Sequence, residues 1–271
     1  MAPEAFFLPV ADGQRFCLYH PPAAAGQVHG AMLYIHPFAE EMNKSRRQSA
    51  LQARRLAKEG FAVLQIDLHG CGDSSGDFGD ATWASWLQDV RAARGWLRQR
   101  CDAPLWLWGL RAGGLLAVEA ARQIDEPVNF LFWQPVVSGK QLLQQFLRLK
   151  VAGEMLGGES KGAMAAIRRQ LDESQSPEIA GYRLNPELAR GLEAAELTPP
   201  ARPGHIVWLE LSTRDDATLP PASVKRIEQW QAAGHDVAAQ IVLGPAFWQT
   251  TDIEEAPALI DASIAALAAR A

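Results

Sequence analysis

Short, uninterrupted apolar runs recur along the chain and set its expected architecture. Four of them lie in the first half, at 31–35, 62–66, 105–110 and 128–133. Continuous apolar runs of this length are typical of parallel strands that helices cover on both faces. Two more strands are predicted in the last third of the chain, at 206–211 and 237–243.

Amphipathic helical segments separate these runs. The segment 44–59 places four apolar side chains on one face, namely Ala50, Ala53, Leu56 and Ala57, as helical periodicity requires. Further helices are predicted at 84–100, 222–233 and 256–269. Alternation of strand and helix predicts a doubly wound, mostly parallel α/β sheet.

The first twenty residues have a different pattern. Residues 4–8 and 15–20 read as two short strands, and the segment between them contains Asp12-Gly13. Asp-Gly is a favoured tight turn between antiparallel strands. An opening hairpin is therefore predicted.

The strand and helix alternation stops between Ser138 and Pro200. Helical patterns at 142–156 and 162–171 fill this stretch, and a proline-rich segment at 198–204 ends it, as expected of a linker. We therefore expect a core made of residues 1–137 and 201–271, and a helical cap insertion at 138–200. The cap is expected over the carboxyl ends of the strands.

Three loops follow predicted strands at the sheet edge where open α/β sheets bind ligands. The first is His36-Pro37-Phe38-Ala39-Glu40-Glu41, and the second runs from Asp67 to Gly76. In the third, Gly109 and Gly113 flank Arg111, with the spacing of a Gly-x-Ser-x-Gly nucleophile elbow.

These loops resemble those of the α/β-hydrolase superfamily. The first resembles the His-Gly-Phe oxyanion loop, in which backbone N–H groups stabilise a tetrahedral oxyanion. The second resembles Asp-x-Arg-Gly-x-Gly-x-Ser, with His69 where arginine is usual, and the third is an elbow with Arg111 at its apex. The resemblance implies an α/β-hydrolase fold with a mostly parallel, doubly wound sheet and an inserted helical cap.

The same resemblance assigns positions to the other two members of a catalytic triad. Asp216, spaced from Pro220 as in the family's acid loop, takes the acid position, with Asp215 as the alternative. Phe247 takes the place of histidine in the family's Gly-x-x-His loop. Because a guanidinium stays protonated near neutral pH, Arg111 is neither nucleophile nor base. The resemblance thus implies a degenerate triad.

Histidines elsewhere offer a poor substitute for the missing base. Of the six in the chain, only His36 and His69 are expected near the site. His36 is interpreted as a structural residue that orients the oxyanion loop, and no histidine is placed to activate Cys71 as a nucleophile.

One branch of the superfamily is particularly similar. His-Pro-Phe-Ala-Glu-Glu-Met-Asn-Lys-Ser-Arg-Arg at 36–47, together with Gly109-Leu110-Arg111, resembles the hydrolase 2 proteins associated with the exosortase A system. This resemblance implies a Gram-negative bacterial context beside exopolysaccharide and protein-sorting genes.

A charge at the elbow must be paired or reach water. Arg111 is expected either to bind an anionic group of a ligand or to form an internal ion pair with Glu40, Glu41 or Asp216, and we favour the internal pair. Trp133 and Trp248 are open to two interpretations, as core residues or as an apolar or sugar-stacking wall. The expected binding residues are His36, Phe38, Glu40, Glu41, Ala112, Trp133 and Trp248.

Composition narrows the possible partners. The net charge of −5 and the sequence pI near 5.7 leave no broad basic face for nucleic acid. Three widely spaced cysteines fit neither a disulfide framework nor a metal site. No metal or cofactor is expected, no apolar stretch reaches the roughly 20 residues of a membrane span, and a cytoplasmic location is expected.

Two functions remain. The first is a catalytically degenerate α/β-hydrolase that binds a small acyl or anionic ligand, or a protein of the polysaccharide and exosortase locus. The second is an atypical hydrolase of an ester or thioester in which Glu40 or Asp216 activates water. There, Arg111 would stabilise charge and the N–H groups of Phe38 and Ala112 would form the oxyanion hole.

Overall fold

The computed structural model describes residues 2–23, 28–156 and 162–270. An eight-stranded sheet in the order β1-β2-β4-β3-β5-β6-β9-β10 forms its centre. The antiparallel hairpin of β1 and β2 lies at one edge, and all the other strands run parallel to one another. The strands are β1 Glu4–Val10, β2 Gly13–His20, β3 Gly30–Ile35, β4 Phe61–Ile66, β5 Leu105–Leu110, β6 Val128–Trp133, β9 His205–Ser212 and β10 Asp236–Leu243.

The predicted strands are all present, and each agrees with its predicted range to within two residues. Every residue of β3, β5 and β6 is buried, which explains why these strands read as uninterrupted apolar runs. The mostly parallel, doubly wound α/β sheet expected from the sequence is confirmed.

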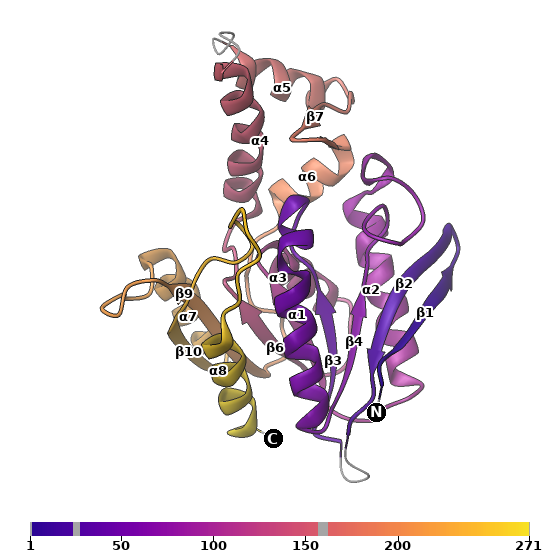
Figure 1. Cartoon of the computed structure of the whole chain (residues 1–271), viewed down its shortest axis with the longest axis vertical. Coiled ribbons are helices and arrows are strands. Elements are labelled where there is room, and N and C mark those ends of the chain that lie inside the picture. Colours follow the sequence, from indigo (N-terminus) through magenta and orange to yellow (C-terminus); the bar gives the residue numbers. More distant parts are fainter. Residues whose placement is uncertain (1, 24–27, 157–161, 271) are drawn as a thin grey trace.

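Helices cover both faces of the sheet (Figure 1). One apolar cluster joins one face to α2 Trp83–Arg98, α3 Ala112–Ala121 and α7 Pro221–Ala232. A second cluster joins the other face to α1 Glu40–Lys58 and α8 Pro257–Ala268. Two separate core layers therefore sandwich the sheet.

Helix α1 begins four residues earlier than the sequence pattern indicated. Its first turn carries Glu40 and Glu41, and carboxylates in a first turn interact favourably with the positive end of the helix dipole. Its buried face is also more polar than predicted, because Gln48 and Gln52 are buried alongside Ala53. The Gln48 side chain exchanges two hydrogen bonds with the backbone of Ala256, at 2.8 and 2.9 Å, and this joins α1 to the start of α8.

The segment between β6 and β9 is largely helical and lies beyond one end of the sheet (Figure 1). It contains the helices α4 Gly139–Leu156, α5 Ala163–Asp172 and α6 Pro186–Ala194. Between α5 and α6 lie two short antiparallel strands, β7 Glu178–Ile179 and β8 Tyr182–Arg183. The sequence pattern predicted the first two helices and missed the small hairpin and α6. A short 3-10 helix, η1 Phe78–Asp80, packs beside β8.

Helix α4 places this segment over the carboxyl ends of the strands. Leu142 and Phe146 of α4 line one cavity with Phe38, which follows β3, and Arg111, which follows β5. The division of the chain into a cap at 138–200 and a core on either side stays a prediction. Within the described residues no helix is both long and apolar enough to cross a membrane.

Candidate functional site

Arg111 occupies a sharp turn between β5 and α3. Its backbone has φ 54° and ψ −117°, a conformation that side-chain-bearing residues adopt only where the surroundings hold them in it. Its N–H donates to the carbonyl of Trp133 at 3.0 Å. A Cβ at Gly113 would collide with the Ile35 carbonyl, and one at Gly109 would collide with the backbone of Gly114. The strand and helix thus approach as closely as the elbow motif predicted.

The side chain of Arg111 is paired with Glu41. Nε and Nη2 of Arg111 each lie 3.1 Å from Oε1 of Glu41, and the two side chains are only 12% and 9% exposed. Burial raises the pKa of Glu41, and the neighbouring Arg111 offsets part of that effect. The guanidinium carbon also lies 5.5 Å from the ring centre of Trp248. An internal ion pair was the favoured expectation, and its partner is Glu41.

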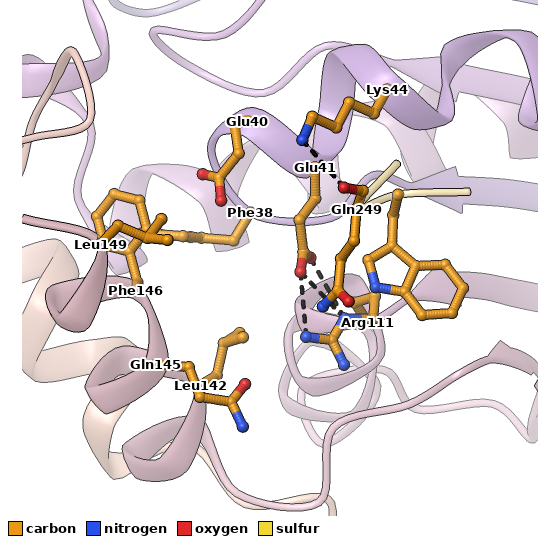
Figure 2. Close-up of a pocket in the computed structure, with 11 residues that line it drawn as sticks. Phe38, Glu40, Glu41, Lys44, Arg111, Leu142, Gln145, Phe146, Leu149 and Gln249 are labelled. Carbon is orange, nitrogen blue, oxygen red and sulfur yellow. Dashed lines mark hydrogen bonds and ion pairs between the residues drawn. The ribbon is translucent and has the colours of Figure 1, made fainter. Parts of the chain in front are cut away.

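The ion pair does not close the site, because both residues line a cavity of about 290 Å³ (Figure 2). On one side of it lie Leu142, Phe146 and Leu149 of α4; Glu41, Arg111 and Gln249 lie opposite. The complete lining is Phe38, Glu40, Glu41, Lys44, Arg111, Leu142, Gln145, Phe146, Leu149, Trp248 and Gln249. An apolar wall facing a polar one suits an amphiphilic small molecule.

The two residues expected to supply oxyanion-hole N–H groups, Phe38 and Ala112, lie at the starts of α1 and α3, and of the two only Phe38 lines the cavity. Ala112 is the first residue of α3, where a helix leaves its N–H groups without intrahelical partners. Phe38 precedes Ala39, whose φ of 49° turns the chain into α1. The Phe38 side chain is buried and packs edge to face against Phe146, with 5.1 Å between ring centres.

His36 is held by the backbone on both ring nitrogens. Nδ1 lies 2.7 Å from the Pro37 carbonyl, and Nε2 accepts from the N–H of Leu68 at 3.3 Å. This arrangement corresponds to the neutral ring with its proton on Nδ1. Burial lowers the pKa of His36, which also favours the neutral form. The contacts fit the structural interpretation of His36.

The second loop turns its histidine away from the cavity. The His69 N–H donates to Oδ2 of Asp89 at 2.6 Å, and the His69 carbonyl accepts from the Trp86 indole at 3.0 Å. Its Nδ1 lies 3.6 Å from Asp12, in the opening hairpin. Cys71 is buried, and burial raises the pKa of its thiol well above the usual range, so a thiolate nucleophile is disfavoured.

The residues at the acid and base positions contribute no side chain to the cavity wall. Asp216 is 76% exposed and pairs with Arg214, with 3.0 Å between Oδ2 and Nη2. Phe247 is fully buried and packs against Trp133 and Trp248. Neither Asp216 nor Phe247 lines the cavity, and Asp215 is exposed.

The two candidate tryptophans separate into one core residue and one wall residue. Trp133 is fully buried, and its indole N–H donates to Ser263 Oγ at 2.9 Å. Its expected place in a pocket wall is therefore wrong, because the side chain points into the layer between β6 and α8. Trp248 lines the cavity.

Several lining residues escaped the sequence analysis. Leu142, Phe146 and Leu149 recur at four- and three-residue spacing within the predicted helix, which is the pattern of one apolar helix face. That spacing was visible in the sequence, but nothing in it showed that this face meets Arg111. Lys44 and Gln249 were also missed; the Lys44 ammonium donates to the Gln249 carbonyl at 3.4 Å.

The described part of the chain contains no group of three or more His, Cys, Asp or Glu side chains placed to hold a metal ion. The charged groups that line the cavity are the carboxylates of Glu40 and Glu41, the Lys44 ammonium and the Arg111 guanidinium.

The chain is similar in sequence and in fold to proteins that are already known. Protein ABHD12B of Homo sapiens is 31% identical over 117 residues, which make up 43% of this chain and 30% of that protein. The matched part thus spans less than a third of the length of that relative.

Solved structures match over nearly the whole chain. Est1E from Butyrivibrio proteoclasticus with bound ferulic acid superposes with a TM-score of 0.65 and 16% identity, covering 98% of both chains. XC6422 from Xanthomonas campestris, described as a serine hydrolase without a lid, gives a TM-score of 0.58 and 17% identity over 97% of this chain and 91% of that one. At these identities the likeness shows the fold.

A family model supplies the classification. The model described as serine aminopeptidase, S33, matches residues 26–173, a span that includes the loop after β3, the elbow and the whole of α5. Since this is more than half of the 271 residues, the chain belongs to the serine aminopeptidase S33 family of α/β hydrolases.

Proposed function

We propose that this protein is an α/β hydrolase with a degenerate catalytic triad that binds a small acyl or anionic ligand instead of hydrolysing an ester through a serine. The observation that carries the proposal is Arg111, which stands at the elbow, is paired with Glu41 and still lines the cavity. A guanidinium there can hold a ligand and cannot attack it.

The ion pair leaves part of the guanidinium available. Nε and Nη2 face Glu41, whereas Nη1 has no hydrogen-bond partner among the residues that the structure describes. The planar fork of arginine favours a carboxylate, phosphate or carbonyl oxygen at such a free edge. The apolar wall from Leu142 to Leu149 would then bury the rest of the ligand.

The resemblance of residues 36–47 and 109–111 to the exosortase-associated hydrolase 2 proteins supports a biological setting. We place the protein in the cytoplasm of an exopolysaccharide-producing bacterium, where the ligand, or a protein of the same locus, would belong to polysaccharide or surface-protein biogenesis. The buried, unpaired Cys17, Cys71 and Cys101 fit a reducing compartment.

A second candidate function is hydrolysis of an ester or thioester by carboxylate-assisted attack of water. Glu40 favours it, because this carboxylate lines the cavity together with Arg111 and Phe38. Asp216 is a weaker candidate for the base because it is exposed and paired with Arg214. Glu40 would accept a proton from the attacking water while Arg111 and the N–H groups of Phe38 and Ala112 stabilise the oxyanion. When the acyl C–O or C–S bond breaks, Glu40 would return that proton to the alcohol or thiol that leaves.

Fluorophosphonate labelling and turnover assays separate these functions. We expect no labelling and no hydrolysis of p-nitrophenyl or thioester substrates, with an active serine esterase as positive control. We also expect native mass spectrometry of the purified protein to detect a bound small molecule that denaturation releases. Stoichiometric labelling would contradict the proposal, and turnover that Glu40→Gln abolishes would favour the second function.

A further inference from the structure

We infer that the ligand of this cavity also carries an ammonium group, and that Glu40 is the residue that binds it. The inference rests on the proposed function, since it assigns a second group to the ligand whose acyl or anionic group faces Arg111. The class it names is an amine-bearing amphiphile with an apolar body.

Three of the four charged side chains of the cavity wall have a partner within the protein. Arg111 pairs with Glu41 through Nε and Nη2, and the Lys44 ammonium is directed at the Gln249 carbonyl (Figure 2). Glu40 has no hydrogen bond or ion pair to any described residue. Its Oε2 is moreover shielded from solvent without a donor, which leaves Oε1 as the oxygen available to a ligand.

The Glu40 carboxylate lies beside apolar and aromatic side chains. In Figure 2 Glu40 lies on the same side of the cavity as Phe38, Phe146 and Leu149. The Tyr182 ring is 6.5 Å from that of Phe146. Burial raises the pKa of Tyr182, and the charge of Glu40 adds to that effect. A strong donor at Oε1 would offset the lost hydration of the carboxylate.

An ammonium fits these surroundings better than a hydroxyl does. Its positive charge would pair with Glu40, and the faces of the neighbouring aromatic rings attract a cation. The four charged residues of the wall, Glu40, Glu41, Lys44 and Arg111, carry no net charge together. A ligand with an ammonium at Glu40 and an anionic group at Arg111 would keep the filled cavity neutral.

Three probes with the same apolar chain test the inference on the full-length protein at neutral pH: octylammonium, octanol and octanoate, titrated by calorimetry. We expect octylammonium to bind about ten-fold more tightly than octanol. Glu40→Gln should remove that difference, and Glu40→Asp should retain part of it. Glu228→Gln, which removes an exposed carboxylate from α7, is the charge-matched control and should bind like the wild type.

Octanoate tests the proposed function independently, because its carboxylate would face Arg111. Octanoate binding without octylammonium binding would refute the ammonium site and leave the proposed function standing. Equal affinities for octylammonium and octanol, or an unchanged octylammonium affinity in a folded Glu40→Gln variant, would also refute it. Failure of all three probes to bind would overturn the proposed function together with the inference.

Discussion

Nη2 of Arg111 lies 3.1 Å from Oε1 of Glu41 beside the start of α3, although the two residues are 70 positions apart in the chain. The pair joins the elbow after β5 to the first turn of α1. It also forms part of the cavity wall. One contact thus has two consequences, for stability and for ligand binding, and each can be measured.

Removing the arginine should destabilise the fold. Arg111→Ala would leave the buried Glu41 carboxylate without its partner, a change that costs about 3 kcal/mol or more in the free energy of unfolding. Urea denaturation of the wild type and the variant measures this cost. Arg214→Ala is the matched control: it breaks an arginine–carboxylate pair whose side chains are 73% and 76% exposed, and it should cost under about 1 kcal/mol. Equal costs for the two variants would show that burial does not distinguish the pairs.

Restoring a serine should not restore a serine hydrolase. In Arg111→Ser the hydroxyl would occupy the elbow, but Phe247 offers no base and His36 uses both ring nitrogens on the backbone. We expect no fluorophosphonate labelling of this variant and no turnover of p-nitrophenyl octanoate beyond that of Arg111→Ala. Stoichiometric labelling of Arg111→Ser would mean that another group activates the serine.

Much of the fold follows from sequence pattern, because β3, β5 and β6 are buried on both faces and therefore read as apolar runs. The elbow was also visible, since close backbone contacts leave no room for a Cβ at Gly109 or Gly113 and the motif therefore shows glycine at both positions. Strands β7 and β8 and helix α6 were missed because they contain only two, two and nine residues, too few for the spacing of apolar residues to reveal a strand or helix.

The side-chain partners at the site are harder to derive. Glu40 and Glu41 are neighbours of the same type, and only the helical rotation between them decides that Glu41 meets Arg111 while Glu40 faces the aromatic side chains. Asp216 accepts two hydrogen bonds from Arg214, two residues before it, and does not line the cavity. Trp133 ends a strand with its side chain toward α8 rather than the cavity. Each of these contacts depends on the direction in which a side chain points in the folded protein, and the spacing of residues in the sequence does not determine that direction.

The close approach at the elbow makes a sharp prediction for Gly113. A methyl group there would press on backbone atoms, including the His36 carbonyl at 2.9 Å, and backbone cannot move aside cheaply. Gly113→Ala should lower the free energy of unfolding by about 2 to 3 kcal/mol. Gly95→Ala, at an exposed position of α2 where nothing lies within 4 Å of the added Cβ, should raise it by about 0.5 to 1 kcal/mol. Thermal melts that show the same direction for both variants would contradict this account.

The pH dependence of stability tests which influence dominates at Glu41. Burial raises the pKa of this carboxyl above its usual 4.5 in spite of Arg111. The folded protein therefore keeps the Glu41 proton at pH values where the unfolded chain has released it. Between the unfolded and the folded pKa, rising pH then lowers the free energy of unfolding, by at most about 1.4 kcal/mol per pH unit.

Glu41→Gln removes this titration and leaves the other carboxyl groups in place. We expect the stability of the wild type relative to Glu41→Gln to fall as the pH rises from 4.5 through the raised folded pKa, and to level off above it. Urea denaturation at a series of pH values measures the difference, and Glu228→Gln should run parallel to the wild type because its carboxylate is exposed. A difference that instead grows with pH would mean that the attraction of Arg111 outweighs burial, so that the carboxylate is the form the fold stabilises.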